Sequence, residues 1–185
     1  MTQALTSDRG VMDIAIRLRT ISQLFNSFDP SPFHEKDLDR DAEEFIVGWV
    51  RELPRGAPFR ITVYLPADEA GRPEAAHIRD ALAYYFDYRA RMIERDLREL
   101  FRIGRRSLAI GIVVLIACLL ASQLIAPLVR NPTTSRIIEE SFILVGWVAN
   151  WRPIEIYLYD WWPLRRRAQL YRRIAEAPVM VEPAP

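Results

Sequence analysis

An apolar and aromatic run reads GWVANWRPIEIYLYDWW from Gly146 to Trp162 and contains two charges of opposite sign, Arg152 and Glu155, well inside it, with Asp160 near its end. Arg152 and Glu155 are three positions apart, so on a helix their side chains can form an ion pair. Pro153 between them weakens the helical hydrogen bonding one turn earlier and predicts a kink. Charged residues within a membrane span are costly and usually have a function. We therefore take Arg152 and Glu155 as the first candidates for a polar site.

This polar site allows two interpretations. The ion pair can be structural and stabilise a helix pair or an oligomer, or Glu155 can line a cation or proton path, as carboxylate rings do in cation pores. Glu140, Trp147 and Trp151 fall on the same helical stripe as Glu155, and Arg152 lies at its edge. Such a polar and aromatic stripe should avoid lipid, so we expect it to contact protein, most simply a second copy of the chain.

Small residues and aromatic residues mark two further features of this region. Gly146 and Asn150 give a small-residue face, and Ala117 and Ala121 have the matching spacing on the preceding apolar segment, which predicts close helix packing. Aromatic side chains gather at the end of the run, where they predict anchoring at a membrane interface. These predicted interface anchors are Tyr157, Tyr159, Trp161 and Trp162.

The elements that would position these residues are membrane spans. Residues 107–129 (SLAIGIVVLIACLLASQLIAPLV) contain no charge and are long enough to cross a ~30 Å hydrocarbon core, so they predict a first transmembrane helix. A polar extracytoplasmic turn at 130–136 and a second transmembrane helix at 137–162 are expected to follow. Arginines flank both outer ends of the pair, which places both termini in the cytoplasm, with a basic helix and tail at 163–185.

The N-terminal part is expected to form a small cytoplasmic α+β domain over residues 11–104, after a flexible N-terminus at 1–10 that lacks the pattern of a signal peptide. Alternating apolar residues predict strands at Met12 to Arg19 and Pro58 to Leu65, and a helical pattern predicts a helix from about Leu38 to Leu53. Another helix is expected to begin at Pro73 and to continue into the first span.

A third strand is needed because two strands rarely make a stable sheet. The tail Val179 to Glu182 can supply it, and a second copy of the chain is the alternative. The predicted fold class is therefore a small α+β cytoplasmic domain, with two or three strands and two helices, fused to a two-helix transmembrane hairpin.

Motifs for catalysis, metal binding or cofactor binding are missing from the sequence. The acidic run from His34 to Glu44 fits no calcium loop and is interpreted as helix capping and a solvated face. His34 and His77 stand alone, which gives no support to a zinc site. Nucleophile motifs and phosphate-binding glycine loops do not occur. We therefore expect no enzyme, no cofactor, no metal and no nucleic-acid partner, and the single Cys118 allows no disulfide within the chain.

The functional expectation is a homo-oligomeric integral membrane scaffold or regulatory protein, with membrane lipid and a cytoplasmic protein as further partners. The alternative is a small cation or proton channel with Glu155 in the ion path. Lys36 is the only lysine beside many arginines, which is typical of a GC-rich bacterial genome and suggests the bacterial inner membrane.

Overall fold

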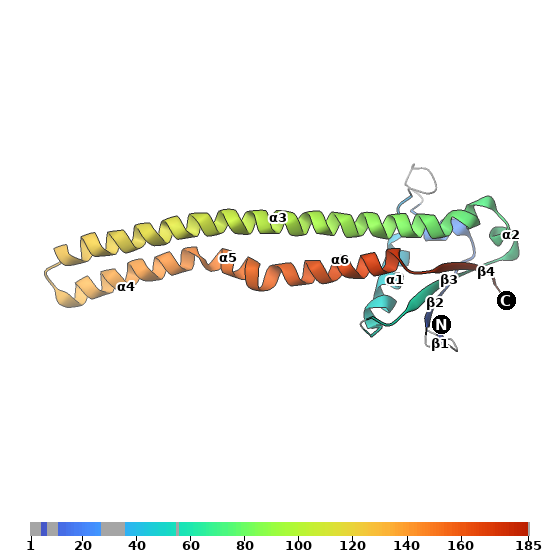
Figure 1. The fold of residues 1–185 in the computed structure, drawn as a ribbon, viewed down its shortest axis with the longest axis horizontal. Coiled ribbons are helices and arrows are strands. Elements are labelled where there is room, and N and C mark those ends of the chain that lie inside the picture. Colours follow the sequence, from blue (N-terminus) through green and yellow to red (C-terminus); the bar gives the residue numbers. More distant parts are fainter. Residues whose placement is uncertain (1–4, 7–10, 27–35, 55, 185) are drawn as a thin grey trace. The chain divides into compact units, whose positions relative to one another are not determined.

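The computed structural model describes residues 5–6, 11–26, 36–54 and 56–184. Most of the expected flexible N-terminus (1–10) and the first two residues of the acidic run, His34 and Glu35, lie outside the described residues. The chain divides into two compact units. The first unit comprises Met1–Met92 and Arg167–Pro185, and the second comprises Ile93–Arg166. Figure 1 shows the elements of both units.

The first unit is built on a sheet with the strand order β1-β2-β3-β4. Strand β2 (Met12–Arg17) pairs in parallel with β3 (Phe59–Leu65), and β3 pairs in parallel with β4 (Val179–Pro183). Strand β1 (Leu5–Thr6) adds a two-residue antiparallel edge. The sequence left two ways to complete the sheet, the C-terminal tail or a second copy of the chain. In the structure the C-terminal tail completes it as β4. This strand lies 114 positions beyond the end of β3, since β3 ends at residue 65 and β4 begins at residue 179.

Helices connect and cover these strands. Helix α1 (Arg40–Glu52) is the crossover between β2 and β3. Its N-cap is Asp39, whose side chain accepts a hydrogen bond from the Asp41 amide. The 3-10 turn η1 (Ile21–Leu24) and the short α2 (Ala67–Ala70) follow β2 and β3. Apolar spacing predicts a core face on α1, of which only Ile46 is fully buried in the structure; its expected members are Ala42, Phe45, Ile46, Trp49 and Leu53. The buried stripe is Ile46, Val47 and Val50.

Helix α3 (Pro73–Ile125) is the dominant element, with 53 residues in one continuous helix. Together with the 3-10 turn η3 (Ala126–Leu128) it forms a stretch of 56 residues that contains an 18-residue window of mean hydropathy 2.7, of which only 11% is buried. This is the one helix among the described residues that is long and apolar enough to cross a membrane. No breaker divides it, because Gly104 is accommodated within the helix.

The predicted fold class, with its two-helix transmembrane hairpin, is wrong, whereas the expected continuation of the helix from Pro73 into the first span is confirmed. The expected second transmembrane helix at 137–162 is not one helix. Instead the chain continues as α4 (Pro132–Ala149), α5 (Trp151–Glu155), the π-helical turn η4 (Ile156–Asp160) and α6 (Trp161–Ala175). The breaks have local causes, because Pro153 cannot donate a backbone hydrogen bond and five charged residues interrupt the apolar pattern. In addition, the sheet is mainly parallel and linked by helices.

Candidate functional site

The most densely connected polar group of the first unit is the carboxylate of Glu43 on α1. It accepts hydrogen bonds from the hydroxyls of Tyr85 on α3, at 2.6 Å, and Tyr171 on α6, at 2.5 Å. The guanidinium of Arg89, one turn after Tyr85, lies 3.2 Å from the same carboxylate. We call Glu43, Tyr85, Arg89 and Tyr171 the Glu43 cluster. It ties three helices of the unit to one side chain.

The Glu43 cluster is held in its charged state by its surroundings. The Glu43 side chain is only 12% exposed. Burial by itself raises the pKa of Glu43, but hydrogen bonds from Tyr171 and Tyr85 and the positive charge of Arg89 outweigh burial and lower the pKa below its ordinary value. Burial and the hydrogen bond to the carboxylate raise the pKa of Tyr85, so its hydroxyl stays protonated and remains a donor. The cluster is therefore a carboxylate with fixed donors, which makes it a poor general base.

A cavity of about 690 Å³ lies beside the Glu43 cluster and has a polar lining. Arginines from three helices line it, namely Arg40 and Arg51 from α1, Arg89 from α3 and Arg167 from α6. The Arg167 guanidinium lies 5.5 Å from the Tyr171 ring centre. Arg40 is paired with the exposed Glu44. The lining contains both signs of charge, so the cavity suits a partner's polar side chains better than a single strongly charged ligand.

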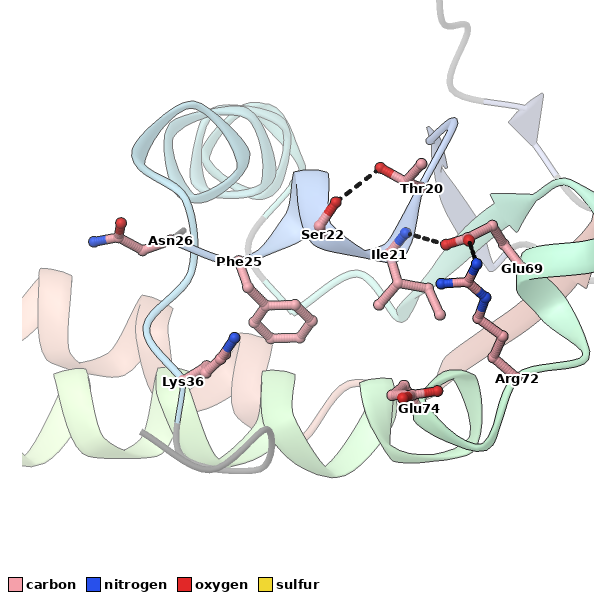
Figure 2. Close-up of a pocket in the computed structure, with 9 residues that line it drawn as sticks. All are labelled: Thr20, Ile21, Ser22, Phe25, Asn26, Lys36, Glu69, Arg72 and Glu74. Atoms are coloured by element: carbon pink, nitrogen blue, oxygen red, sulfur yellow. Dashed lines mark hydrogen bonds and ion pairs between the residues drawn. The ribbon is translucent and has the colours of Figure 1, made fainter. Parts of the chain in front are cut away.

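A second cavity, of about 350 Å³, lies between η1, α2 and the start of α3 (Figure 2). Its floor includes the rings and alkyl groups of Phe25 and Ile21. Glu69 is 5% exposed, accepts a 2.8 Å hydrogen bond from the Ile21 amide and pairs with Arg72 at 2.9 Å. Glu69 thereby links η1, which follows β2, to α2, which follows β3. Both of its carboxylate oxygens are used in this way, so its role is structural.

The predicted ion pair of the second unit is present and has a third member. Arg152 Nη1 lies 2.9 Å from Glu155 Oε2 and 3.1 Å from Asp160 Oδ2. The π-helical turn that separates Glu155 from Asp160 widens the helix and brings both carboxylates to the same guanidinium. The side chains of Arg152 and Glu155 are 56% and 41% exposed. Glu155 therefore has a fixed counterion, and the group faces the outside of this single chain.

Close packing in the second unit is centred on Asn150. Its side-chain amide donates hydrogen bonds of 3.0 Å to the backbone oxygens of Gly111 on α3 and Gly146 on α4. A Cβ atom at Gly111 would lie 2.6 Å from Asn150 Oδ1, and one at Gly146 would lie 2.7 Å from a Leu115 methyl group. Asn150 and Gly146 are both buried. These contacts bring the backbones of α3 and α4 together.

Other residues chosen from the sequence occupy different places. Ala117 is exposed and Ala121 is only half-buried, because α3 instead presents Gly111, Leu115 and Cys118 to α4. Glu140 is paired with Arg136 and is exposed, and Trp147 and Trp151 are 62% and 67% exposed. Pro153 is buried.

The predicted interface anchors divide into packed and exposed rings. Tyr157 stacks on Phe101 of α3, with ring centres 6.0 Å apart, and Trp161 lies 6.4 Å from the same ring. Tyr159 and Trp162 are exposed. The first pair contributes to helix packing, whereas the second pair is available to the surroundings.

Comparisons with known proteins do not assign this chain to a family. No protein-family model matches this chain, and neither curated proteins nor solved structures gave a match. In the described part of the chain, no three side chains of His, Cys, Asp or Glu come together in a way that could hold a metal ion.

The Glu43 cluster was not predicted from the sequence, because Glu43 belongs to an acidic run that was interpreted as a solvated face. A signal for it exists. The buried residues Ile46, Val47 and Val50 lie three, four and seven positions after Glu43, which places Glu43 on the core face of α1. Correct placement of that stripe would have identified a buried acid, which requires partners.

Proposed function

We propose that this chain is an integral membrane protein that presents the first unit as a cytoplasmic interaction domain, and that it acts as a homo-oligomeric scaffold or regulatory protein. One observation carries the proposal. Strand β3 precedes the apolar segment of α3 and β4 follows the return run, yet the two strands pair side by side over five residue pairs from Ile61↔Val179 to Leu65↔Pro183. Segments of one sheet lie on one side of a membrane.

The consequence for topology is a return crossing. If α3 crosses the bilayer, the chain must cross again before β4, so α4 and the elements after it are the second pass. Exposed apolar side chains on both α3 and α4 support this, since a water-soluble unit would bury them. They include Ile110, Val113, Leu120 and Leu124 on α3 and Leu144, Val145, Trp147 and Val148 on α4.

Arginines near both outer ends of the apolar region support a cytoplasmic position of the first unit. Arg102, Arg105 and Arg106 precede the apolar stretch of α3, and Arg165, Arg166 and Arg167 follow the return run. The scarcity of lysine supports a bacterial inner membrane. No charge bias of comparable size is found in the short connection between α3 and α4.

Self-association is supported by the Arg152, Glu155 and Asp160 group. Ionisable residues in membrane proteins almost always face protein or water instead of lipid. In the single chain this group is substantially exposed, so another protein surface should cover it, and a second copy is the simplest one. A channel with Glu155 in the ion path has less support, because Arg152 already neutralises that carboxylate.

The topology is tested by labelling single cysteines with a membrane-impermeant maleimide in a Cys118→Ser background. Thr133→Cys, in the first turn of α4, should react from outside intact cells. Ala184→Cys, after β4, should react only after the membrane is opened. Reaction of both positions from outside, or recovery of the protein in the soluble fraction, would contradict the proposal. The mass of the detergent-solubilised complex tests self-association separately.

A further inference from the structure

Four arginines of the second unit border its apolar surface. Arg105 and Arg106 are the last two residues of α3 before an uncharged stretch that begins at Ser107, and both are exposed. On α6, the guanidinium of Arg165 lies 5.7 Å from the ring centre of Trp161, and that of Arg166 lies 5.4 Å from Trp162. We call Arg105, Arg106, Arg165 and Arg166 the interfacial arginine cluster.

The two helices contribute their arginines on either side of one aromatic contact. Phe101 of α3 contacts Trp161 of α6, with ring centres 6.4 Å apart. Because α3 and α6 run antiparallel here, Arg105, one turn after Phe101, and Arg165, one turn after Trp161, lie on opposite sides of this contact, about 12 Å apart along the helix axes. The Trp161 ring is fixed further by a 2.9 Å hydrogen bond from its indole N–H to the Tyr157 carbonyl. The cluster is therefore attached to a rigid aromatic contact.

None of these four guanidinium groups forms an ion pair with any residue that the structure describes. The neighbouring cations differ in this respect, because Arg102 is paired with Glu99 and Arg152 with Glu155 and Asp160. A guanidinium that stacks on an indole ring keeps its N–H edge free for an oxygen ligand. Four positive charges therefore remain available beside the apolar surface.

We propose that the interfacial arginine cluster binds the phosphate groups of anionic phospholipids, with Trp161 and Trp162 lying at the headgroup level. Guanidinium groups bind phosphate oxygens by paired, charge-assisted hydrogen bonds. Tryptophan concentrates at the membrane interface, where its ring is apolar and its N–H is polar. This inference rests on the proposed membrane location and adds lipid selectivity to it.

The test measures thermal unfolding of the full-length protein in neutral detergent micelles, with added phosphatidylglycerol or phosphatidylcholine. The rise of the midpoint with lipid concentration gives an apparent dissociation constant for each lipid. We expect tighter binding of phosphatidylglycerol. The Arg165→Gln/Arg166→Gln variant should lose about fivefold in affinity per arginine, or about 25-fold in total. Binding of phosphatidylcholine should change little.

The matched control is Arg19→Gln/Arg79→Gln, which removes two exposed arginines from the first unit and should leave the lipid selectivity intact. Equal stabilisation by both lipids, or unchanged selectivity in the Arg165/Arg166 variant, would overturn the proposal. Equal stabilisation by inorganic phosphate or glycerol phosphate would identify a site for soluble anions and would also overturn it. Carbonate extraction of the same variants from cell membranes reports membrane insertion independently, so loss of selectivity can be distinguished from failure of the proposed topology.

Discussion

The hydroxyl of Tyr171 donates a 2.5 Å hydrogen bond to the carboxylate of Glu43, although the two residues are 128 positions apart. Glu43 lies on α1, which crosses over between β2 and β3, whereas Tyr171 lies on α6, which leads into β4. The contact therefore holds α1 and α6 together within the first unit, although the whole second unit lies between Glu43 and Tyr171 in the sequence. It accompanies the pairing of β3 with β4, and both interactions join the early and late parts of the chain.

Removal of this hydrogen bond should destabilise the first unit. Tyr171→Phe leaves the ring in place, which packs 5.8 Å from Phe86, but removes a donor from a carboxylate that is mostly buried. A hydrogen bond to a charged group contributes about 1.5–3 kcal/mol, so we expect the free energy of unfolding to fall by that amount. Chemical denaturation in detergent measures it. Tyr84→Phe is the control, because Tyr84 is 44% exposed, and no change is expected there. Equal effects of the two substitutions would contradict the role of the cluster.

Acid should weaken the first unit through Glu43. Its pKa in the folded protein is lowered below the ordinary value of 4.5, so the folded state favours the carboxylate. The stabilisation is fully present above that ordinary value and is lost as the pH falls through the lower folded pKa. Unfolding free energies of the wild type should therefore fall between about pH 5 and pH 3 more steeply than those of Glu43→Gln. Glu44→Gln, at the exposed neighbour, should retain the wild-type slope. Parallel curves for wild type and Glu43→Gln would show that Glu43 does not contribute.

The strands at the start of the chain and the helix from Pro73 could be predicted from period-two and helical apolar patterns alone. The sheet order could not, because β4 contains only five residues and its partner is far away in the sequence. The division of the return run also escaped prediction. A hydropathy pattern averages over the break at Asn150 and the π-helical turn, whereas both depend on side-chain contacts with α3 or between nearby charges.

Substitutions of Arg152 and of Glu155 are expected to differ in how strongly they disturb assembly. Arg152→Gln leaves both Glu155 and Asp160 without their counterion, whereas Glu155→Gln leaves Arg152 paired with Asp160 at 3.1 Å. We therefore expect Arg152→Gln to reduce the yield of assembled protein in detergent by several-fold. Glu155→Gln should reduce that yield only modestly. Size-exclusion chromatography of the extracted protein measures this. The reverse order, or loss of ion flux in a correctly assembled Glu155→Gln variant, would favour the channel alternative.

Close approach of α3 and α4 makes Gly111 sensitive to a single methyl group. Gly111→Ala would place a Cβ atom 2.6 Å from Asn150 Oδ1 and 3.0 Å from the Ala149 carbonyl oxygen, so the two helices must separate. We expect a loss of about 1–3 kcal/mol in stability, as for overpacking elsewhere. Gly48→Ala is the control, since a Cβ atom there meets nothing within 4 Å. That substitution should be neutral or slightly stabilising because alanine favours the helix.

We propose that β3 and β4, which precede and follow the apolar segment in the sequence, form one sheet while the protein is in the membrane. The most direct test is oxidative cross-linking in membrane vesicles of a Tyr64→Cys/Glu182→Cys variant in a Cys118→Ser background, because Tyr64 and Glu182 are register partners. We expect rapid formation of an intrachain disulfide, seen as increased mobility on a non-reducing gel, and much slower formation in the neighbouring pair Tyr64→Cys/Val181→Cys. Two results together would contradict the pairing of β3 with β4 in the membrane. The intrachain disulfide would be absent from membrane-integrated protein, and residue 182 would be labelled from the opposite side to residue 64.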